Sequence, residues 1–431
     1  MNLTRESFYT LLFQISGFIC ATIAGIIVAR ALGPENRGLL SMALLYPFFF
    51  LSIFNPSINV AIIYHMGKKK FNTSIFAGNA FILGFVLSLL SLIFFFITYA
   101  HFRESFYRGI ELKYLLLSIS SVPFYFMLGY SSSILQGSML IRQYNLSNQL
   151  QQYCNLIFIL IFIAFWNLTL TGAILAGISG IVLGGIYAVV KVLKSTEGLS
   201  FDKTLALGLV KDGGKLYIGS ISTFIVSQSN IFILNYYRTP AEVGYFAIAF
   251  AIANVLSFFL TSLTVGLYPK VAHATIDETI NLVQVACRQL LLITAIAAFF
   301  TAVFSKYIVL LYGGKLFLPS VKPLLLLLPG ITISVVPGIL NNLWLRKGWF
   351  TQITYMAVFN SLVSLLLNLI LIPRFGVTGA AFATTVTYSI SSLMAIVLFS
   401  RYGGRDISKL FIPQKEDLGM YTEILVRFRQ R

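Results

Sequence analysis

The polar side chains that could contact a substrate lie within or at the ends of long apolar runs. Amides occur at Asn55 and Asn59 in one run, and at Gln228 and Asn230 in another. Amide groups can hydrogen-bond to sugar hydroxyls, but they also join membrane helices to one another. Arg30 ends the first run, where its guanidinium can turn inward to a phosphate or outward to water. We take these five residues as candidate substrate contacts, with helix packing and snorkelling as the alternatives.

Three further cations follow apolar runs at corresponding positions in the two halves of the chain: Arg142, Arg346 and Lys347. At the mouth of a passage they could receive a diphosphate. At the end of a membrane helix they could equally anchor the chain among lipid headgroups. Both roles stay open on the sequence alone.

Acidic residues are absent from the apolar runs, because all 14 Asp and Glu residues fall in predicted loops, tails or termini. A carrier of organic cations, or one driven by protons through carboxylates, is expected to keep an acid within the membrane despite the cost. The chain also has no G-x-x-x-x-G-K-[ST] loop, no paired carboxylates and only three dispersed histidines. We therefore predict no catalytic residue, no metal and no cofactor, and a neutral or anionic cargo.

The composition is that of a membrane protein. Of 431 residues, 58% are hydrophobic and 10% charged, against about 25% charged in soluble domains, and the mean hydropathy is +0.86. Continuous apolar runs of about 20 residues are each long enough to cross the hydrocarbon core as a helix. We predict an all-α integral membrane protein with about twelve spans, near 8–30, 39–65, 73–99, 114–138, 146–166, 170–192, 216–236, 244–268, 287–305, 321–345, 351–372 and 379–400.

The net charge of +17 is explained by membrane orientation rather than by nucleic acid, because the basic residues lie between spans. The N-terminus, the loops after even-numbered spans and the C-terminal tail hold about two thirds of the 31 Lys and Arg residues. By the positive-inside rule both termini are cytoplasmic. The segment 29–38 then faces outward as a hairpin, in which Glu35 and Arg37 are expected to be solvated.

A repeat relates the two halves of the chain. Pro34 matches Pro240 and Gly38 matches Gly244, in both cases 206 residues apart. Each half has an even number of spans, so the halves share one orientation and form a parallel repeat. Two such six-helix lobes are expected to enclose a V-shaped central cavity.

The predicted organisation has two lobes and two basic connecting segments: an N-terminal lobe at 1–193, a cytoplasmic linker at 194–215, a C-terminal lobe at 216–400 and a basic cytoplasmic tail at 401–431. The linker and the tail are expected to lie on anionic membrane lipids. The segment 305–320 is expected to be a short interfacial or re-entrant turn.

Three segments resemble the polysaccharide-biosynthesis flippases of the multidrug/oligosaccharidyl-lipid/polysaccharide exporter superfamily: A-R-A-L-G-P-E-N-R-G at 29–38, T-P-A-E-V-G-Y-F-A-I-A at 239–249 and I-P-R-F-G-V-T-G-A-A-F-A at 372–383. The resemblance covers nearly the whole chain. It implies charged groups at the positions of Arg30 and Asn230. Asn230 is a departure, since Q-x-D is common where Gln228-Ser229-Asn230 stands, and ion coupling through that acid is in doubt.

The resemblance implies a flippase, and not an enzyme, that turns polyprenyl-diphosphate-linked oligosaccharide across a bacterial cytoplasmic membrane. A polysaccharide polymerase and glycosyltransferases are the implied partners. Three alternatives remain: a drug or cation exporter of the same superfamily, a peptidoglycan-precursor flippase and a membrane glycosyltransferase or polymerase. An exporter of cations is expected to have an acidic residue within the membrane. A peptidoglycan-precursor flippase usually has more spans. A glycosyltransferase or polymerase would need carboxylates in sizeable outward loops.

Overall fold

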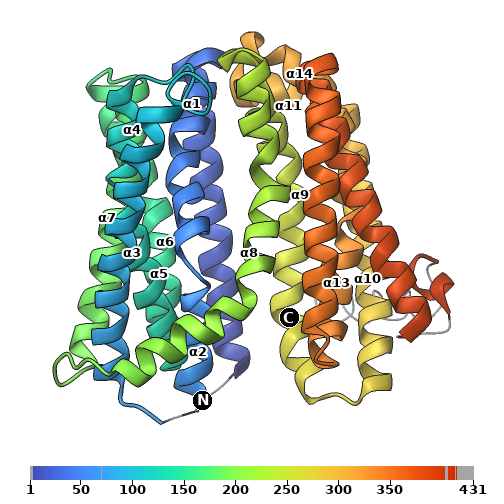
Figure 1. The fold of residues 1–431 in the computed structure, drawn as a ribbon. Helices are drawn as coiled ribbons and strands as arrows, with labels where there is room; N and C mark the ends of the chain where they lie inside the picture. Colours follow the sequence, from blue (N-terminus) through green and yellow to red (C-terminus); the bar gives the residue numbers. More distant parts are fainter. Residues whose placement is uncertain (1–2, 69, 403–405, 413, 415–431) are drawn as a thin grey trace, which may run out of the picture.

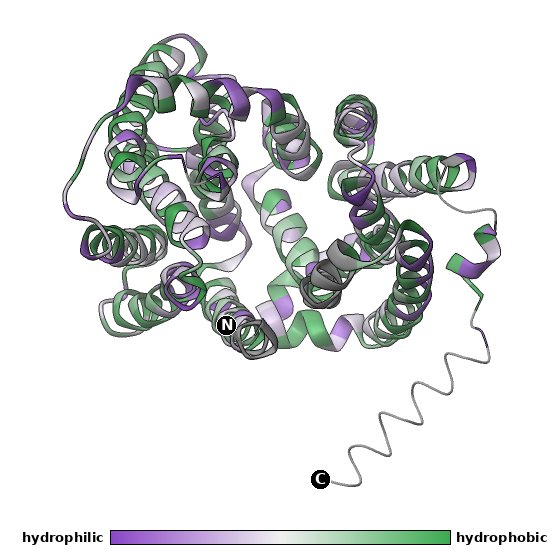
Figure 2. Ribbon diagram, turned by 90° about the horizontal axis from the view of Figure 1, so that it is seen from below, coloured by the Kyte–Doolittle hydropathy of each residue, from purple (hydrophilic) through white to green (hydrophobic). Residues whose placement is uncertain are grey.

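In the computed structural model, helices form two lobes that lie side by side (Figure 1). The structure describes residues 3–68, 70–402, 406–412 and 414, and no strand occurs among them. Most of the predicted basic tail, 401–431, lies outside the described residues. Seen along the helices, the two groups are again apparent, and hydrophobic residues follow the helices of both (Figure 2).

The first lobe contains seven α-helices and one π-helix: α1 (Leu3–Phe54), α2 (Ile58–Gly67), α3 (Thr73–Phe102), α4 (Leu112–Ile119), α5 (Val122–Gly137), α6 (Ile141–Ile159), the π-helix η1 (Leu160–Phe165) and α7 (Leu170–Lys194). The second lobe contains seven α-helices and two 3₁₀-helices: α8 (Lys203–Tyr237), α9 (Pro240–His273), α10 (Ile276–Val303), α11 (Ser305–Gly313), η2 (Lys315–Ser320), α12 (Val321–Ile333), α13 (Val335–Arg346), α14 (Phe350–Tyr402) and η3 (Ile407–Leu410).

The predicted all-helical membrane fold is confirmed. Ten helical segments of the described chain are long and apolar enough to cross a membrane. Two of them, α1 and α14, are each interrupted at one residue with non-helical backbone, Gly33 and Gly376. Each therefore holds two of the predicted spans, which accounts for all twelve. Side chains such as Phe85, 70% exposed, present the apolar surface that lipid requires.

The first hairpin turns at a single glycine. Gly33 has φ 69°, in the left-handed region that a side chain disfavours, and Pro34 follows it. Proline suits the first turn of a helix because the amide hydrogen that it lacks has no partner there. Helix thus resumes directly after Gly33. We call this end of the bundle the Gly33 end, and the opposite end, which carries the N-terminus and α2, the α2 end (Figure 1).

Several other predicted features differ in detail. The span expected at 39–65 is broken at Asn55-Pro56-Ser57, so that α1 ends and α2 begins there. The segment 305–320 forms α11 followed by the 3₁₀-helix η2. The expected linker, 194–215, is helical from Lys203, and Asp202 caps this helix by accepting a hydrogen bond from the Leu205 amide at 2.7 Å.

The two lobes meet at the Gly33 end, where α1 crosses α9. A Cβ atom at Gly38 would lie 1.8 Å from the carbonyl oxygen of Pro240, and a Cβ at Gly244 would lie 2.1 Å from that of Pro34. Beside the crossing, the rings of Phe106 and Phe232 stack with centroids 5.1 Å apart. The glycines therefore allow two helix backbones to touch, as small residues do in membrane bundles.

Helix α8 contacts both lobes. Near its start it packs on α2, where His65 Nε2 and Asp212 Oδ2 are 2.8 Å apart and the hydroxyls of Ser57 and Ser220 are 2.9 Å apart. Its later part packs along α14. The second part of the predicted linker, from Lys203, is thus the start of a helix that contacts both lobes.

Candidate functional site

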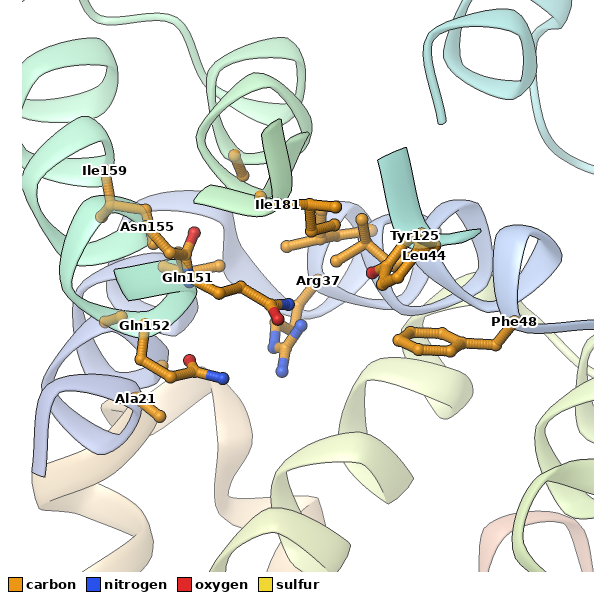
Figure 3. A pocket seen from close by; sticks show the side chains of 16 residues that line it. Ala21, Arg37, Leu44, Phe48, Tyr125, Gln151, Gln152, Asn155, Ile159 and Ile181 are labelled. Atoms are coloured by element: carbon orange, nitrogen blue, oxygen red, sulfur yellow. The ribbon is translucent and has the colours of Figure 1, made fainter. Parts of the chain in front are cut away.

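A cavity of about 280 Å³ lies inside the first lobe, between α1, α5, α6 and α7 (Figure 3). Its apolar wall comes mainly from α1 and α7, and its polar wall from α6. The side chains and glycines that line it are Ala21, Ala24, Gly25, Val28, Arg37, Leu40, Leu44, Phe48, Tyr125, Gln151, Gln152, Asn155, Ile159, Ala173, Gly177 and Ile181.

Arg37 is the one charged residue in this lining. The expectation that it lies in a solvated turn is wrong, because helix resumes at Pro34 and carries Arg37 into the lobe. Its Nε is buried and has no hydrogen-bond partner, while Nη1 is 3.4 Å from the Ser41 hydroxyl, a long contact. Glu35, by contrast, is exposed as expected.

Three amides of α6 face Arg37 across the cavity: Gln151, Gln152 and Asn155. In Figure 3 the head of Gln151 points toward the guanidinium. Residues 151 and 155 are four apart, and 152 and 155 three apart, so one side of the helix presents all three. Sequence analysis missed this group, although the run Q-L-Q-Q-Y-C-N inside a predicted span was a visible signal.

Tyr312 of the second lobe packs against Gly25, one of the residues that line this cavity. A Cβ atom at Gly25 would lie 2.2 Å from its hydroxyl oxygen, so this phenol on α11 packs directly on the cavity lining. No hydrogen bond of that hydroxyl occurs within the described part of the chain. The second lobe thus packs against the wall of this cavity through a side chain that carries a polar group.

No carboxylate lines the cavity. Of the Asp and Glu residues whose burial the structure describes, none is buried, although Asp202, Asp212 and Glu242 are only partly exposed. Glu242 lies at the Gly33 end, where a Cβ at Gly376 would meet its Oε2 at 2.5 Å. The electrostatic character of the cavity is therefore positive, set by one guanidinium among neutral amides.

Arg30 does not line this cavity. Its Nε and Nη2 donate to the carbonyl oxygen of Leu311, at 3.2 and 2.7 Å, and so join α1 to α11 of the other lobe. The side chain is exposed, at the Gly33 end. In this conformation Arg30 links the two lobes by hydrogen bonds. Its contact with a phosphate stays a prediction.

The predicted amides of the first lobe lie toward the α2 end. Asn55 Oδ1 accepts hydrogen bonds from the Ile58 amide at 3.1 Å and from the Tyr130 hydroxyl at 3.3 Å, and so begins α2. Asn59 lies in α2 and is partly exposed. Neither lines the cavity of Arg37, and their role in substrate binding stays a prediction.

The predicted amides of the second lobe lie on α8. Gln228 is partly exposed, whereas Asn230 is buried and its Nδ2 is 3.5 Å from the Thr384 hydroxyl of α14. Near it, Asn368 Nδ2 donates to the Ser229 hydroxyl at 3.3 Å. This polar contact joins α8 to α14, which is the packing role that amides commonly have in membranes.

The three predicted cations at helix ends are separated. Arg142 is exposed at the start of α6. Arg346 donates to the Ala274 carbonyl oxygen at 3.2 Å, and the ammonium of Lys347 lies 5.0 Å from the centre of the Trp349 ring. Arg346 and Lys347 are consecutive residues at the end of α13, whereas Arg142 lies on α6 of the other lobe. Their contact with a diphosphate stays a prediction.

A second cavity, of about 610 Å³, lies in the second lobe between α10 and α12 and is almost wholly apolar. Arg288 and Phe411 lie at one end of it, and Arg288 donates to the Lys409 carbonyl oxygen at 3.0 Å. Within the described residues no group of three or more His, Cys, Asp or Glu side chains could hold a metal ion.

The fold is similar to those of solved membrane proteins. The chain superimposes on an inward-facing multidrug resistance MATE transporter of the MOP superfamily with a TM-score of 0.71, at 14% identity, covering 94% of this chain and 98% of that one. It superimposes on the lipid II flippase MurJ, in an inward closed conformation, with a TM-score of 0.68, at 16% identity over 93% and 88%. The chain thus shares the fold of these two multi-pass membrane proteins.

The sequence gives the family. Residues 3–275 match the model of the polysaccharide biosynthesis protein family, and the chain belongs to that family. A putative O-antigen transporter of Escherichia coli K12 is 25% identical over 413 residues, which is 91% of this chain and 96% of that protein. An uncharacterized membrane protein of Methanocaldococcus jannaschii is 25% identical over 320 residues, 69% of this chain; the match spans 62% of that relative's length, less than two thirds.

Proposed function

We propose that this transporter is a flippase that moves polyprenyl-diphosphate-linked oligosaccharide, a repeat unit of O-antigen, capsule or exopolysaccharide, across a bacterial cytoplasmic membrane. The observation that carries the proposal is the lining of the first-lobe cavity. It has one cation, several amides and no carboxylate. Such a lining suits an anionic, hydroxyl-rich headgroup and disfavours an organic cation.

The physical task is to move phosphates and sugars through hydrocarbon without leaving their polar groups unsatisfied. Each hydroxyl transferred without a partner costs several kcal/mol, and a bare phosphate far more. The amides, the hydroxyls and the guanidinium replace the water that the headgroup loses, while the polyprenyl tail stays in lipid beside the lobes. No bond is made or broken, so the protein acts as a carrier and not as an enzyme.

Alternating access supplies the movement. The basic residues at the α2 end, among them Lys68 and Lys211, favour a cytoplasmic α2 end with both termini inside. The lobes touch at the opposite end, where α1 crosses α9. This arrangement is then the inward-facing state, from which rocking of the lobes about the parallel repeat would expose the headgroup outside. Glycosyltransferases would supply the cargo and a polymerase would consume it, while membrane lipids surround the lobes.

A peptidoglycan-precursor flippase is the second candidate, because its cargo has the same diphosphate and the solved lipid II flippase shares the fold. A drug or cation exporter of the superfamily also shares the fold. The exporter is disfavoured by the absence of a buried acid from the described residues. A membrane glycosyltransferase or polymerase ranks last.

Deletion of the gene in its own host tests the proposal. We expect loss of a surface polysaccharide and accumulation of its lipid-linked repeat unit at the inner leaflet, both reversed by the wild-type gene on a plasmid. Normal surface polysaccharide together with raised sensitivity to cationic drugs would instead favour the exporter. Loss of peptidoglycan synthesis would favour the second candidate.

A further inference from the structure

Arg37 is a cation held inside a membrane lobe without a counter-ion. No described carboxylate lies within 4 Å of it, its Nε is buried without a partner, and its contact with Ser41 is long at 3.4 Å. Arg37 as a whole is partly exposed, but a guanidinium that is partly withdrawn from water still needs charge-assisted hydrogen bonds to repay its desolvation. The guanidinium therefore has hydrogen-bond donors that are free to bind an anion. In Figure 3 it points into the cavity.

The side-chain amides that face Arg37 across the cavity are also free to form hydrogen bonds. Gln151, Gln152 and Asn155 make no side-chain hydrogen bond to any described residue, and all three line the cavity. Each offers two donors and an acceptor, which is the combination that a sugar hydroxyl needs. Other amides of the same helix are engaged in packing: Asn145 donates to the Thr10 hydroxyl at 2.8 Å and Asn148 to the Tyr144 carbonyl oxygen at 2.9 Å.

We propose that Arg37 and these three α6 amides form the subsite for the phosphate and the first sugar of the lipid-linked cargo. The guanidinium binds phosphate oxygens through two parallel hydrogen bonds, and the amides bind hydroxyls of the adjoining sugar. The cavity, about 280 Å³, is at the lower limit of ligand pockets, so the rest of the oligosaccharide lies outside it. The assignment rests on the proposed function, because it locates the headgroup of that cargo.

Binding to the purified full-length protein in nanodiscs tests the subsite. The probes are undecaprenyl diphosphate and the uncharged alcohol undecaprenol, with inorganic pyrophosphate as a soluble competitor. Arg37→Gln should weaken binding of undecaprenyl diphosphate by about 10- to 100-fold, the usual worth of hydrogen bonds to a charged group, and leave undecaprenol unaffected. Arg37→Lys should lose less, because it keeps the charge but not the fork. The matched control is Arg103→Gln, at an exposed arginine that follows α3.

A second variant keeps the test decisive if Arg37→Gln folds poorly. Gln151→Glu places a carboxylate where the Gln151 head now points at the guanidinium. It should form an internal ion pair that raises the melting temperature and at the same time abolishes binding of the diphosphate. A merely structural role of Gln151 predicts no such opposition of stability and affinity.

The outcomes separate this proposal from the function on which it rests. Competition by pyrophosphate that is lost in Arg37→Gln supports the subsite and attributes the binding to the diphosphate. Equal binding of undecaprenyl diphosphate by wild type, Arg37→Gln and Gln151→Glu overturns the subsite and leaves the flippase standing. No binding by the wild type, together with transport of an organic cation, overturns both.

Discussion

Gly38 and Gly244 lie against each other's helices at the point where the two lobes cross, and the contact is reciprocal. Each glycine faces the carbonyl oxygen of the proline that begins the other's helix, Pro240 for Gly38 and Pro34 for Gly244. The glycine amide nitrogens are also close, since a Cβ at either position would lie 3.0–3.2 Å from the other's nitrogen. The two glycines occupy corresponding positions of the internal repeat predicted from the sequence, 206 residues apart.

The reciprocal contact predicts that even one methyl group is too large there. Gly38→Ala should destabilise the closed Gly33 end by roughly 1–3 kcal/mol, because neither backbone can give way. The melting temperature of the purified protein and its flipping rate should both fall. Gly129→Ala in α5, where a Cβ meets nothing within 4 Å, is the control and should change neither. If the two variants behave alike, the lobes do not close at this crossing.

The two roles of Arg30, the observed link to Leu311 and the predicted contact with phosphate, can be separated by experiment. Its guanidinium is engaged by the Leu311 carbonyl oxygen here, so a contact with phosphate would belong to the state in which the lobes part at the Gly33 end. Arg30→Ala should then slow flipping about tenfold, while the affinity for undecaprenyl diphosphate in the present state is unchanged. The measurement compares both quantities at equal protein level. Undiminished flipping would remove Arg30 from the list of phosphate contacts.

Substitution of Asn230 tests how the second lobe tolerates an acidic side chain. Its side chain is buried against Thr384 of α14. Asn230→Asp should therefore lower stability by about 2–3 kcal/mol, the cost of a carboxylate in mid-membrane. Asn230→Ser, which stays neutral, is the control. Melting in detergent measures both, and an unaltered melting temperature in Asn230→Asp would mean that an ion or water already satisfies that position.

Hydropathy and the repeat predicted the fold, because span length is fixed by the membrane and the turn at Gly33 needs a residue free to adopt positive φ. The prediction that Arg37 lies in a solvated turn was wrong for a physical reason. Charged residues between two spans resemble a loop, but Pro34 restarts the helix one residue after the turn, so that Arg37 lies on a helix and lines the cavity. The Leu311 partner of Arg30 lies 281 residues away on the other lobe, and no local pattern predicts it.

On the proposed function, the two lobes carry a lipid-linked, anionic saccharide through a passage without acids. The most direct measurement places the purified protein in vesicles with an undecaprenyl-diphosphate-linked oligosaccharide and follows the access of an external lectin to the sugar. We expect that sugar initially in the inner leaflet becomes accessible much faster than in protein-free vesicles, and that an organic cation such as tetraphenylphosphonium is not taken up. Sugar that stays inaccessible while the cation accumulates would contradict it.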